Sequence, residues 1–246
     1  MKIYLVGDKY MKLCGCSTCN DTLCAKKVPI FSFLSDEDIK KIVDMTGHNS
    51  YKKGDLLCSE GEKSDTLFII NEGGVKLSKL TKDGKEQIVH IFTSGDFFGE
   101  LSLFSNNETY NFDVHAISDL KICTLTKQNM DEILMSNPEI SLKLLHVITN
   151  RLTQTENLAQ NLATKDAEIR IAYMLLQFAE KYGVETSQGL QVKLPINREE
   201  MANYVGVTRE TISRKLSIFE ELGIISLRGN KLLIINQLEL LKSYVE

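Results

Sequence analysis

The distribution of apolar and polar residues changes twice along the chain. A helical pattern opens residues 28–47, where Ser35 precedes the apolar positions and Asp38 follows three residues later, a spacing typical of a helix N-terminus. From Tyr51 to Leu125, short alternating segments are separated by glycines, which predicts strands joined by tight turns and closed into a barrel. From residue 127 onward, apolar residues recur at steps of three and four, which predicts helices.

Residues 127–163 carry the longest helical pattern. Asn137-Pro138 divides it into a short and a long helix, because the residue before proline disfavours helical geometry. In the long helix, small and apolar side chains form the seam of a coiled coil, which predicts a dimer interface. The seam consists of Leu145, Ile148, Leu152, Thr155, Ala159 and Leu162. Polar residues, Arg151 among them, border the seam and suit its rim.

The segment from Pro195 to Ile225 predicts two short helices joined by a turn at Gly206, with Thr208 as the cap of the second helix. The apolar residues of this second helix face inward and leave a polar outer face. That outer face carries Arg209, Glu210, Ser213 and Arg214. Arginine donates to guanine and glutamate accepts from cytosine, so the pattern predicts a helix that reads DNA. The following LRGNKLLII predicts a small hairpin around Gly229.

Composition limits the possible classes of protein. The chain has 246 residues, enough for two ordinary domains, and its hydrophobic fraction of 43% is that of a globular protein. With a net charge of −4 it is no polycation, so DNA affinity has to come from placed side chains. No apolar run is long enough for a membrane span. The apolar stretch among the first residues is too short for a signal peptide. We therefore expect a cytoplasmic protein without a membrane partner.

Four of the six cysteines crowd into one polar segment, at Cys14, Cys16, Cys19 and Cys24. In the cytoplasm these are expected to be thiols, metal ligands or redox sensors rather than structural disulfides. Three interpretations follow from the spacing: an iron–sulfur cluster that takes a fourth ligand from elsewhere, a zinc site of four local cysteines, or a dithiol switch. Cys58 lies in an alternating segment and is interpreted as a small buried hydrophobe.

Three stretches resemble one known family across nearly the whole chain. TRETISRKL with its hairpin, KKGDLLCSEGEKSDTLFIINEGGVKL and SGDFFGELSLF are similar to segments of the CRP/FNR transcription regulators. The resemblance implies an α+β fold with a cyclic-nucleotide-binding-like β-barrel, a long dimerisation helix and a C-terminal winged helix-turn-helix. The implied division is 1–27 sensor loop, 28–136 effector barrel, 137–165 dimerisation helix and 166–246 DNA-binding domain. The implied partners are a second copy of the chain, near-palindromic double-stranded DNA and RNA polymerase.

The cysteines resemble those of the oxygen-sensing branch of this family. Cys16, Cys19 and Cys24 are similar to its N-terminal triplet, and Cys123 matches its remote fourth ligand. The resemblance implies a [4Fe–4S] cluster, with Cys14 as an alternative to Cys16, and a homodimeric regulator that senses oxygen or redox state. The half-site on DNA could resemble TTGAT or TGTGA, since the recognition residues match both branches.

The cyclic-nucleotide site of the family is only partly present. Glu100 is kept, but the phosphate-binding Arg-Ser pair falls at Tyr110 and Asn111, which provide no cation for a cyclic phosphate. We expect no cyclic nucleotide here. Glu100 is then interpreted as a structural carboxylate at a strand end, bonded to backbone amides.

Other classes of function are less well supported by the residues. None of the four histidines stands in a spacing with carboxylates or thiols that suggests a catalytic triad or metal, so no catalytic residue is expected. A haem-based gas sensor on the same fold would leave the N-terminal cysteines unexplained. A regulator switched by disulfide formation, or one carrying a structural zinc, stays open as an alternative.

Overall fold

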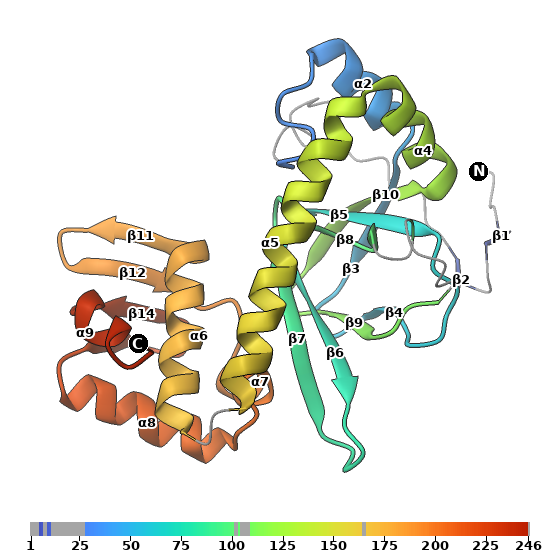
Figure 1. Cartoon of the computed structure of the whole chain (residues 1–246). Helices are drawn as coiled ribbons and strands as arrows, with labels where there is room; N and C mark the ends of the chain where they lie inside the picture. The colour runs from blue at the N-terminus through green and yellow to red at the C-terminus, as the bar shows by residue number, and fades with distance from the viewer. Residues whose placement is uncertain are drawn as a thin grey trace. The chain divides into compact units, whose positions relative to one another are not determined.

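A computed structural model describes residues 5–6, 9–10, 28–100, 103, 109–163 and 166–245 (Figure 1). The expected cluster ligands Cys14, Cys16, Cys19 and Cys24 lie outside the described residues. Within the described range near the N-terminus, β1 (Leu5–Val6) pairs with β2 (Lys9–Tyr10) in an antiparallel ladder.

The chain forms two compact units. The first consists of Met1–Lys79 and His90–Arg151, and the second of Leu80–Val89 and Leu152–Glu246. This partition does not test the four-part division expected from the sequence.

Two four-stranded sheets are formed between residues 47 and 126, in the orders β3-β10-β5-β8 and β4-β9-β6-β7, and most of their residues belong to the first unit. The strands are β3 (Gly47–Tyr51), β4 (Leu56–Cys58), β5 (Thr66–Glu72), β6 (Gly74–Leu80), β7 (Glu86–Thr93), β8 (Phe97–Phe98), β9 (Asp113–Ala116) and β10 (Leu120–Thr126). The predicted barrel therefore takes the form of two facing sheets. Gly73 makes the tight turn from β5 to β6 with φ of 89°, where a Cβ would lie 2.2 Å from the Asp119 carbonyl oxygen.

An apolar core fills the space between the two sheets. It draws on alternate residues of seven of the strands, with Leu120 and Ile122 from β10. Aromatic rings are prominent in this core: the Phe68 and Phe98 rings stack with centroids 4.7 Å apart, and the Phe92 ring lies 6.2 Å from Phe98. These described aromatic and aliphatic side chains pack together between the two sheets.

A second apolar core lies on the outer face of the β3-β10-β5-β8 sheet. Cys123 and Leu125, which alternate with the inward residues of β10, belong to it together with Val28 and Ile30. Three helices contribute to this core: α2 (Asp36–Asp44), α4 (Lys127–Ser136) and the first turns of α5 (Pro138–Ala163). In Figure 1 these helices gather at one end of the unit.

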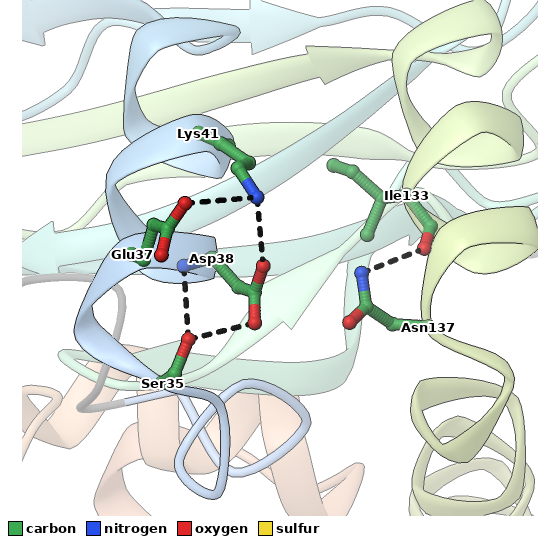
Figure 2. A network of polar contacts seen from close by, with 6 residues as sticks. All are labelled: Ser35, Glu37, Asp38, Lys41, Ile133 and Asn137. Carbon is green, nitrogen blue, oxygen red and sulfur yellow. Dashed lines mark hydrogen bonds and ion pairs between the residues drawn. The ribbon is translucent and has the colours of Figure 1, made fainter.

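The helix boundaries follow the local signals in the sequence (Figure 2). At the start of α2 the Ser35 hydroxyl oxygen accepts from the Asp38 backbone N–H at 3.2 Å, and its O–H donates to the Asp38 carboxylate at 2.7 Å. Between α4 and α5, the Asn137 side chain donates to the carbonyl of Ile133 at 3.4 Å. The predicted N-cap and the predicted break before Pro138 are both confirmed.

The second unit combines helices with one four-stranded sheet of order β11-β12-β14-β13. Its elements are α6 (Ala167–Tyr182), β11 (Gly183–Thr186), β12 (Gly189–Lys193), α7 (Arg198–Val205), α8 (Arg209–Glu221), β13 (Ile225–Arg228), β14 (Leu232–Ile235) and α9 (Leu238–Lys242). The predicted C-terminal hairpin is confirmed as β13–β14, and it joins a second hairpin, β11–β12, in the same sheet. Among the described helices, none has the length and apolar character to cross a membrane.

Candidate DNA-binding surface and sensor sites

Helices α7 and α8 are joined by a short turn whose geometry is set by local hydrogen bonds (Figure 1). Asn197 and Glu200 form a reciprocal capping box at the start of α7. Gly206 ends α7 in the left-handed conformation, with φ of 68°, and the Thr208 hydroxyl accepts from the Thr211 backbone N–H to begin α8. The predicted helix-turn-helix is confirmed.

Helix α8 has one buried face and one exposed face. Ile212, Leu216 and Phe219 are each 1% exposed or less. The four residues predicted to read bases, Arg209, Glu210, Ser213 and Arg214, are all exposed. They lie in the first two turns of α8, and none of their side chains is bonded to another described residue. Three charged groups and the Ser213 hydroxyl are therefore available to a ligand in solution, and the role of these residues in base reading stays a prediction.

Two contacts from α6, which the sequence did not predict, hold this motif. Arg170 donates from Nη1 to the carbonyls of Val205 and Gly206, at 2.9 and 3.2 Å, and so caps the C-terminus of α7 at the turn. Lys215 of α8 forms an ion pair with Glu168. One contact joins α6 to the end of α7 and the other joins α6 to α8. Together they hold α7 and α8 at a fixed angle to each other.

The hairpin β13–β14 adds a second basic feature to the same unit. Its turn is made at Gly229 with φ of 64°, and Arg228 and Lys231 flank the turn with exposed side chains. Cations on a short hairpin next to a recognition helix suit contacts with phosphates, which position a protein on DNA without reading its sequence.

The predicted dimer seam is largely open along α5. Leu145 and Leu152 are 62% and 57% exposed, Ala159 is exposed, and Ile148 and Thr155 are half-buried. The side chain of Leu162 lies outside the described residues. Large exposed leucines along one helix are typical of a surface that is covered by a partner.

Glu100 lies two residues after the end of β8, and its observed partner differs from the one expected. Among the described residues no backbone amide donates to it, and Arg151 of α5 donates to its carboxylate with 2.5 Å between Nη1 and Oε1. The other terminal nitrogen of Arg151 donates to the Phe97 carbonyl at 2.5 Å, and the guanidinium stacks over the Phe92 and Phe97 rings. Arg151 therefore packs into the first unit and is not the rim residue that the heptad pattern indicated.

The place expected for a phosphate-binding pair is occupied by a buried phenol. Tyr110 is 5% exposed, and its ring lies 6.3 Å from the rings of both Phe68 and Phe112. Burial raises the pKa of the Tyr110 phenol, so this group stays neutral at physiological pH. Asn111 is exposed and uncharged. Neither residue can neutralise a cyclic phosphate.

Cys58 of β4 faces the core between the two sheets, whereas Cys123 of β10 faces the outer core. Cys58 is 2% exposed in the core between the sheets, which confirms its prediction as a small buried residue. Cys123 is 5% exposed in the outer core. His48 lies beside it, with 3.4 Å between Nδ1 and the Cys123 sulfur. Sequence reasoning did not connect this histidine with the cysteine, because 75 residues separate them.

Comparisons with known proteins agree with this architecture. Residues 48–137 match the cyclic nucleotide-binding domain model, and residues 169–244 match the Crp-like helix-turn-helix domain model. The chain is 33% identical over 184 residues to the CRP-like cAMP-activated global transcriptional regulator of Mycobacterium tuberculosis, which covers 75% of this chain and 82% of that protein. This chain belongs to the CRP/FNR family of transcription regulators.

Further relatives and solved structures are similar to this chain. The cAMP-activated global transcriptional regulator CRP of Pasteurella multocida is 32% identical over 187 residues, covering 76% of this chain and 88% of that protein. Among solved structures, FixK2 from Bradyrhizobium japonicum superposes with a TM-score of 0.73 at 23% identity, over 82% of this chain and 98% of that one. A mutant of CooA from Carboxydothermus hydrogenoformans also has a TM-score of 0.73, at 26% identity over 84% of this chain and 90% of that one.

Membership of the CRP/FNR family makes this protein a DNA-binding transcription regulator, and the named curated relatives are transcriptional regulators. The named curated relatives are activated by cAMP, so the comparisons do not show the oxygen-sensing branch that the cysteines resemble. The signal that this chain reads has to be argued from its own residues.

Proposed function

We propose that this CRP/FNR regulator is a homodimer that senses oxygen or redox state through a [4Fe–4S] cluster. The ligands would be Cys16, Cys19, Cys24 and Cys123, with Cys14 able to replace Cys16. The observation that carries the proposal is the position of Cys123, which faces the outer core and not the space between the sheets. A nucleotide-like effector would occupy that inner space, whereas a ligand on Cys123 lies on the helical side of the sheet.

The N-terminal chain enters the same outer core. Val28 and Ile30 are 1% and 0% exposed and belong to the cluster that contains Cys123. Only four residue steps separate Val28 from Cys24, and an extended chain spans at most about 3.6 Å per residue. The covalent chain therefore keeps Cys24 within about 14 Å of Val28. This tether supports a shared site for the N-terminal cysteines and Cys123.

The donor set fits the proposed group. Four cysteine sulfurs are the usual ligands of such a cluster, and thiolates this close in sequence need a cation or cluster to offset their repulsion. When bound, the cluster supplies iron and sulfide that react with oxygen. Cys123 would hold the N-terminal segment against β10, which leads directly into α4 and α5.

The link to DNA runs through the outer core. Ile140 and Leu144 of α5 pack in the cluster that contains Cys123, so a change of ligation at Cys123 alters the packing of the first turns of the dimer helix. Two copies paired along α5 would present two α8 helices about one DNA turn apart to a near-palindromic site. Arg209, Glu210, Ser213 and Arg214 would then read bases. RNA polymerase is the proposed further partner of the bound dimer.

A cyclic nucleotide is the second candidate for the effector. One observation favours it beyond the names of the relatives: Glu100 is 6% exposed, and its Oε2 has no hydrogen-bond partner among the described residues, so it could accept from a ribose hydroxyl. Against it stand the missing phosphate clamp at Tyr110 and Asn111 and the aromatic packing between the sheets. We propose that the cyclic nucleotide is not the signal.

The first experiment measures metal content. Full-length protein purified without oxygen should contain about four iron and four sulfide per chain, with a charge-transfer band that air bleaches. Cys123→Ser should lose both, while Cys58→Ser, the matched control in the inner core, should keep them. Colourless protein that contains zinc, or only free thiols, would overturn the cluster and move the switch to a zinc-stabilised loop or a disulfide.

The second experiment separates the two effectors. Calorimetry measures the binding of cyclic AMP to the anaerobic protein. Fluorescence anisotropy of a labelled near-palindromic duplex measures the DNA affinity of the same protein. DNA affinity is expected to change on exposure to air and to be insensitive to millimolar cyclic AMP. A many-fold gain of DNA affinity with cyclic AMP would reject this part of the proposal.

A further inference from the structure

His48 and Cys123 form a cross-strand pair on the outer face of the first sheet. They are direct partners in the antiparallel register of β3 and β10, so their side chains extend from the same face. The Cys123 sulfur lies 3.4 Å from His48 Nδ1, within the range for a hydrogen bond to sulfur. On the other side of Cys123, β5 places Ile69, which has no donor for the sulfur.

The imidazole is held in this orientation from its far edge. His48 Nε2 lies 3.5 Å from the Thr46 hydroxyl, and that hydroxyl donates to the Val43 carbonyl at the end of α2, at 2.8 Å. The ring is half-buried, and it stands between the Thr46 hydroxyl and the Cys123 sulfur.

We propose that His48 is a positioning residue for Cys123, whose Nδ1–H donates a hydrogen bond to the sulfur when that sulfur ligates the cluster. The inference rests on the proposed function. A ligating thiolate carries no proton, so the contact becomes a hydrogen bond when the neutral imidazole carries its proton on Nδ1. Nε2 is then an acceptor, and the Thr46 hydroxyl turns from the Val43 carbonyl to donate to it. Hydrogen bonds to ligating sulfurs orient them and tune the reduction potential and metal affinity.

The donated hydrogen bond has a defined direction of effect. It places positive charge density beside a sulfur that gains electron density on reduction, so it favours the reduced cluster and holds the ligand in place. Removal of the donor should make the reduction potential more negative and speed the loss of iron. A side chain that only fills space would affect neither quantity beyond a general loss of stability.

The test compares the full-length wild type with His48→Leu and His48→Asn, all purified without oxygen. Leucine keeps an apolar side chain of similar bulk, whereas the asparagine amide can place an N–H near the position of imidazole Nδ1. Redox titration followed by the charge-transfer band gives the potential, and transfer of iron to a chelator gives the release rate. Circular dichroism of the metal-free chains checks that the fold is retained.

We expect His48→Leu to shift the potential to more negative values and to release iron about ten-fold faster than the wild type. His48→Asn should remain close to the wild type in both quantities. A leucine variant that assembles no cluster, beside an asparagine variant that does, also supports the role of the donor.

Two results would overturn the inference alone while the proposed function stands. The first is a wild-type cluster whose potential and release rate are unchanged by leucine. The second is an asparagine variant as impaired as the leucine variant, which would show that His48 acts by ring packing. A wild-type chain without iron overturns the proposed function itself and this inference with it.

Discussion

Arg151 and Glu100 form a buried ion pair that joins helix α5 to the chain just after strand β8. Their side chains are 15% and 8% exposed, and the arginine also donates to the Phe97 carbonyl. A guanidinium that meets a carboxylate, a carbonyl and two aromatic faces is held firmly, because few other orientations satisfy all of its donors. This contact holds Arg151 of α5 against the chain that follows β8.

Breaking this pair should destabilise the first unit strongly. Arg151→Met leaves the Glu100 carboxylate buried without its cation, and we expect a loss of about 3 kcal/mol in the free energy of unfolding. Arg151→Met combined with Glu100→Gln should recover much of that loss, because no unpaired buried charge remains. Urea unfolding followed by far-ultraviolet circular dichroism measures both values.

The exposed ion pair between Lys121 and Glu72 provides the matched control. Its side chains are 46% and 66% exposed, so Lys121→Met should cost less than about 1 kcal/mol. Equal losses for the Arg151 and Lys121 variants would contradict a special role for the buried pair.

Glu210 is expected to determine base preference at one position of the DNA site. It is exposed in the first turn of α8, and its carboxylate can accept from cytosine N4 in the major groove. Glu210→Ala should relax preference at that position with a cost of about 1–3 kcal/mol. Selection from a randomised site measures the effect, and Glu221→Ala, at the exposed C-terminal end of α8, is the control. Unchanged preference in the Glu210 variant would reject the assignment.

Leu152 is expected to lie at the dimer interface. It is 57% exposed in the described chain, and a charge there would be buried against its twofold mate on pairing. Leu152→Glu should raise the dimer dissociation constant by about ten-fold or more, since each 1.4 kcal/mol is a factor of ten. Sedimentation equilibrium measures the constant. Gln154→Glu, two residues along and about 200° around the helix, should leave it nearly unchanged, and equal weakening by both variants would argue against this seam.

Tyr110 should give the first unit a component of stability that is lost in alkali. Burial raises the pKa of the Tyr110 phenol above the value of about 10 in the unfolded chain. Its contribution is therefore fully present below pH of about 10 and is lost as pH rises from there toward the folded-state pKa, by up to about 1.4 kcal/mol per pH unit. Tyr110→Phe should show a shallower decline of the unfolding free energy above pH of about 10. Identical slopes for wild type and variant would show that Tyr110 ionises normally in the folded state.

Much of the fold could be predicted because its signals are local. Ser35 and Thr208 cap helices through backbone N–H groups three residues away, and Pro138 ends α4 through the residue that precedes it. The exposed face of α8 follows from the 3.6-residue period that buries Ile212 and Leu216. The helix-turn-helix and the exposure of its four predicted readers were therefore available from the sequence.

The partners of Glu100 and Cys123 could not be predicted in the same way. The sequence indicated backbone amides for Glu100 and a rim position for Arg151, and both expectations were wrong. A heptad pattern assigns residues to the faces of one helix. It contains no information that the buried carboxylate of Glu100 lies beside α5. His48 escaped notice for the same reason, since its relation to Cys123 exists only in the register of β3 with β10.

The helix caps, the helix-turn-helix and the C-terminal hairpin could be predicted from the sequence, because each depends on residues close together in the chain. The faces that distant residues share became known from the tertiary structure. It placed Cys123 on the outer core with Val28, Tyr110 on the inner one and Arg151 against Glu100, since these placements depend on how strands separated by tens of residues align. The register between strands that are distant in the sequence is set by the packing of the whole core. It cannot be predicted from a local sequence pattern.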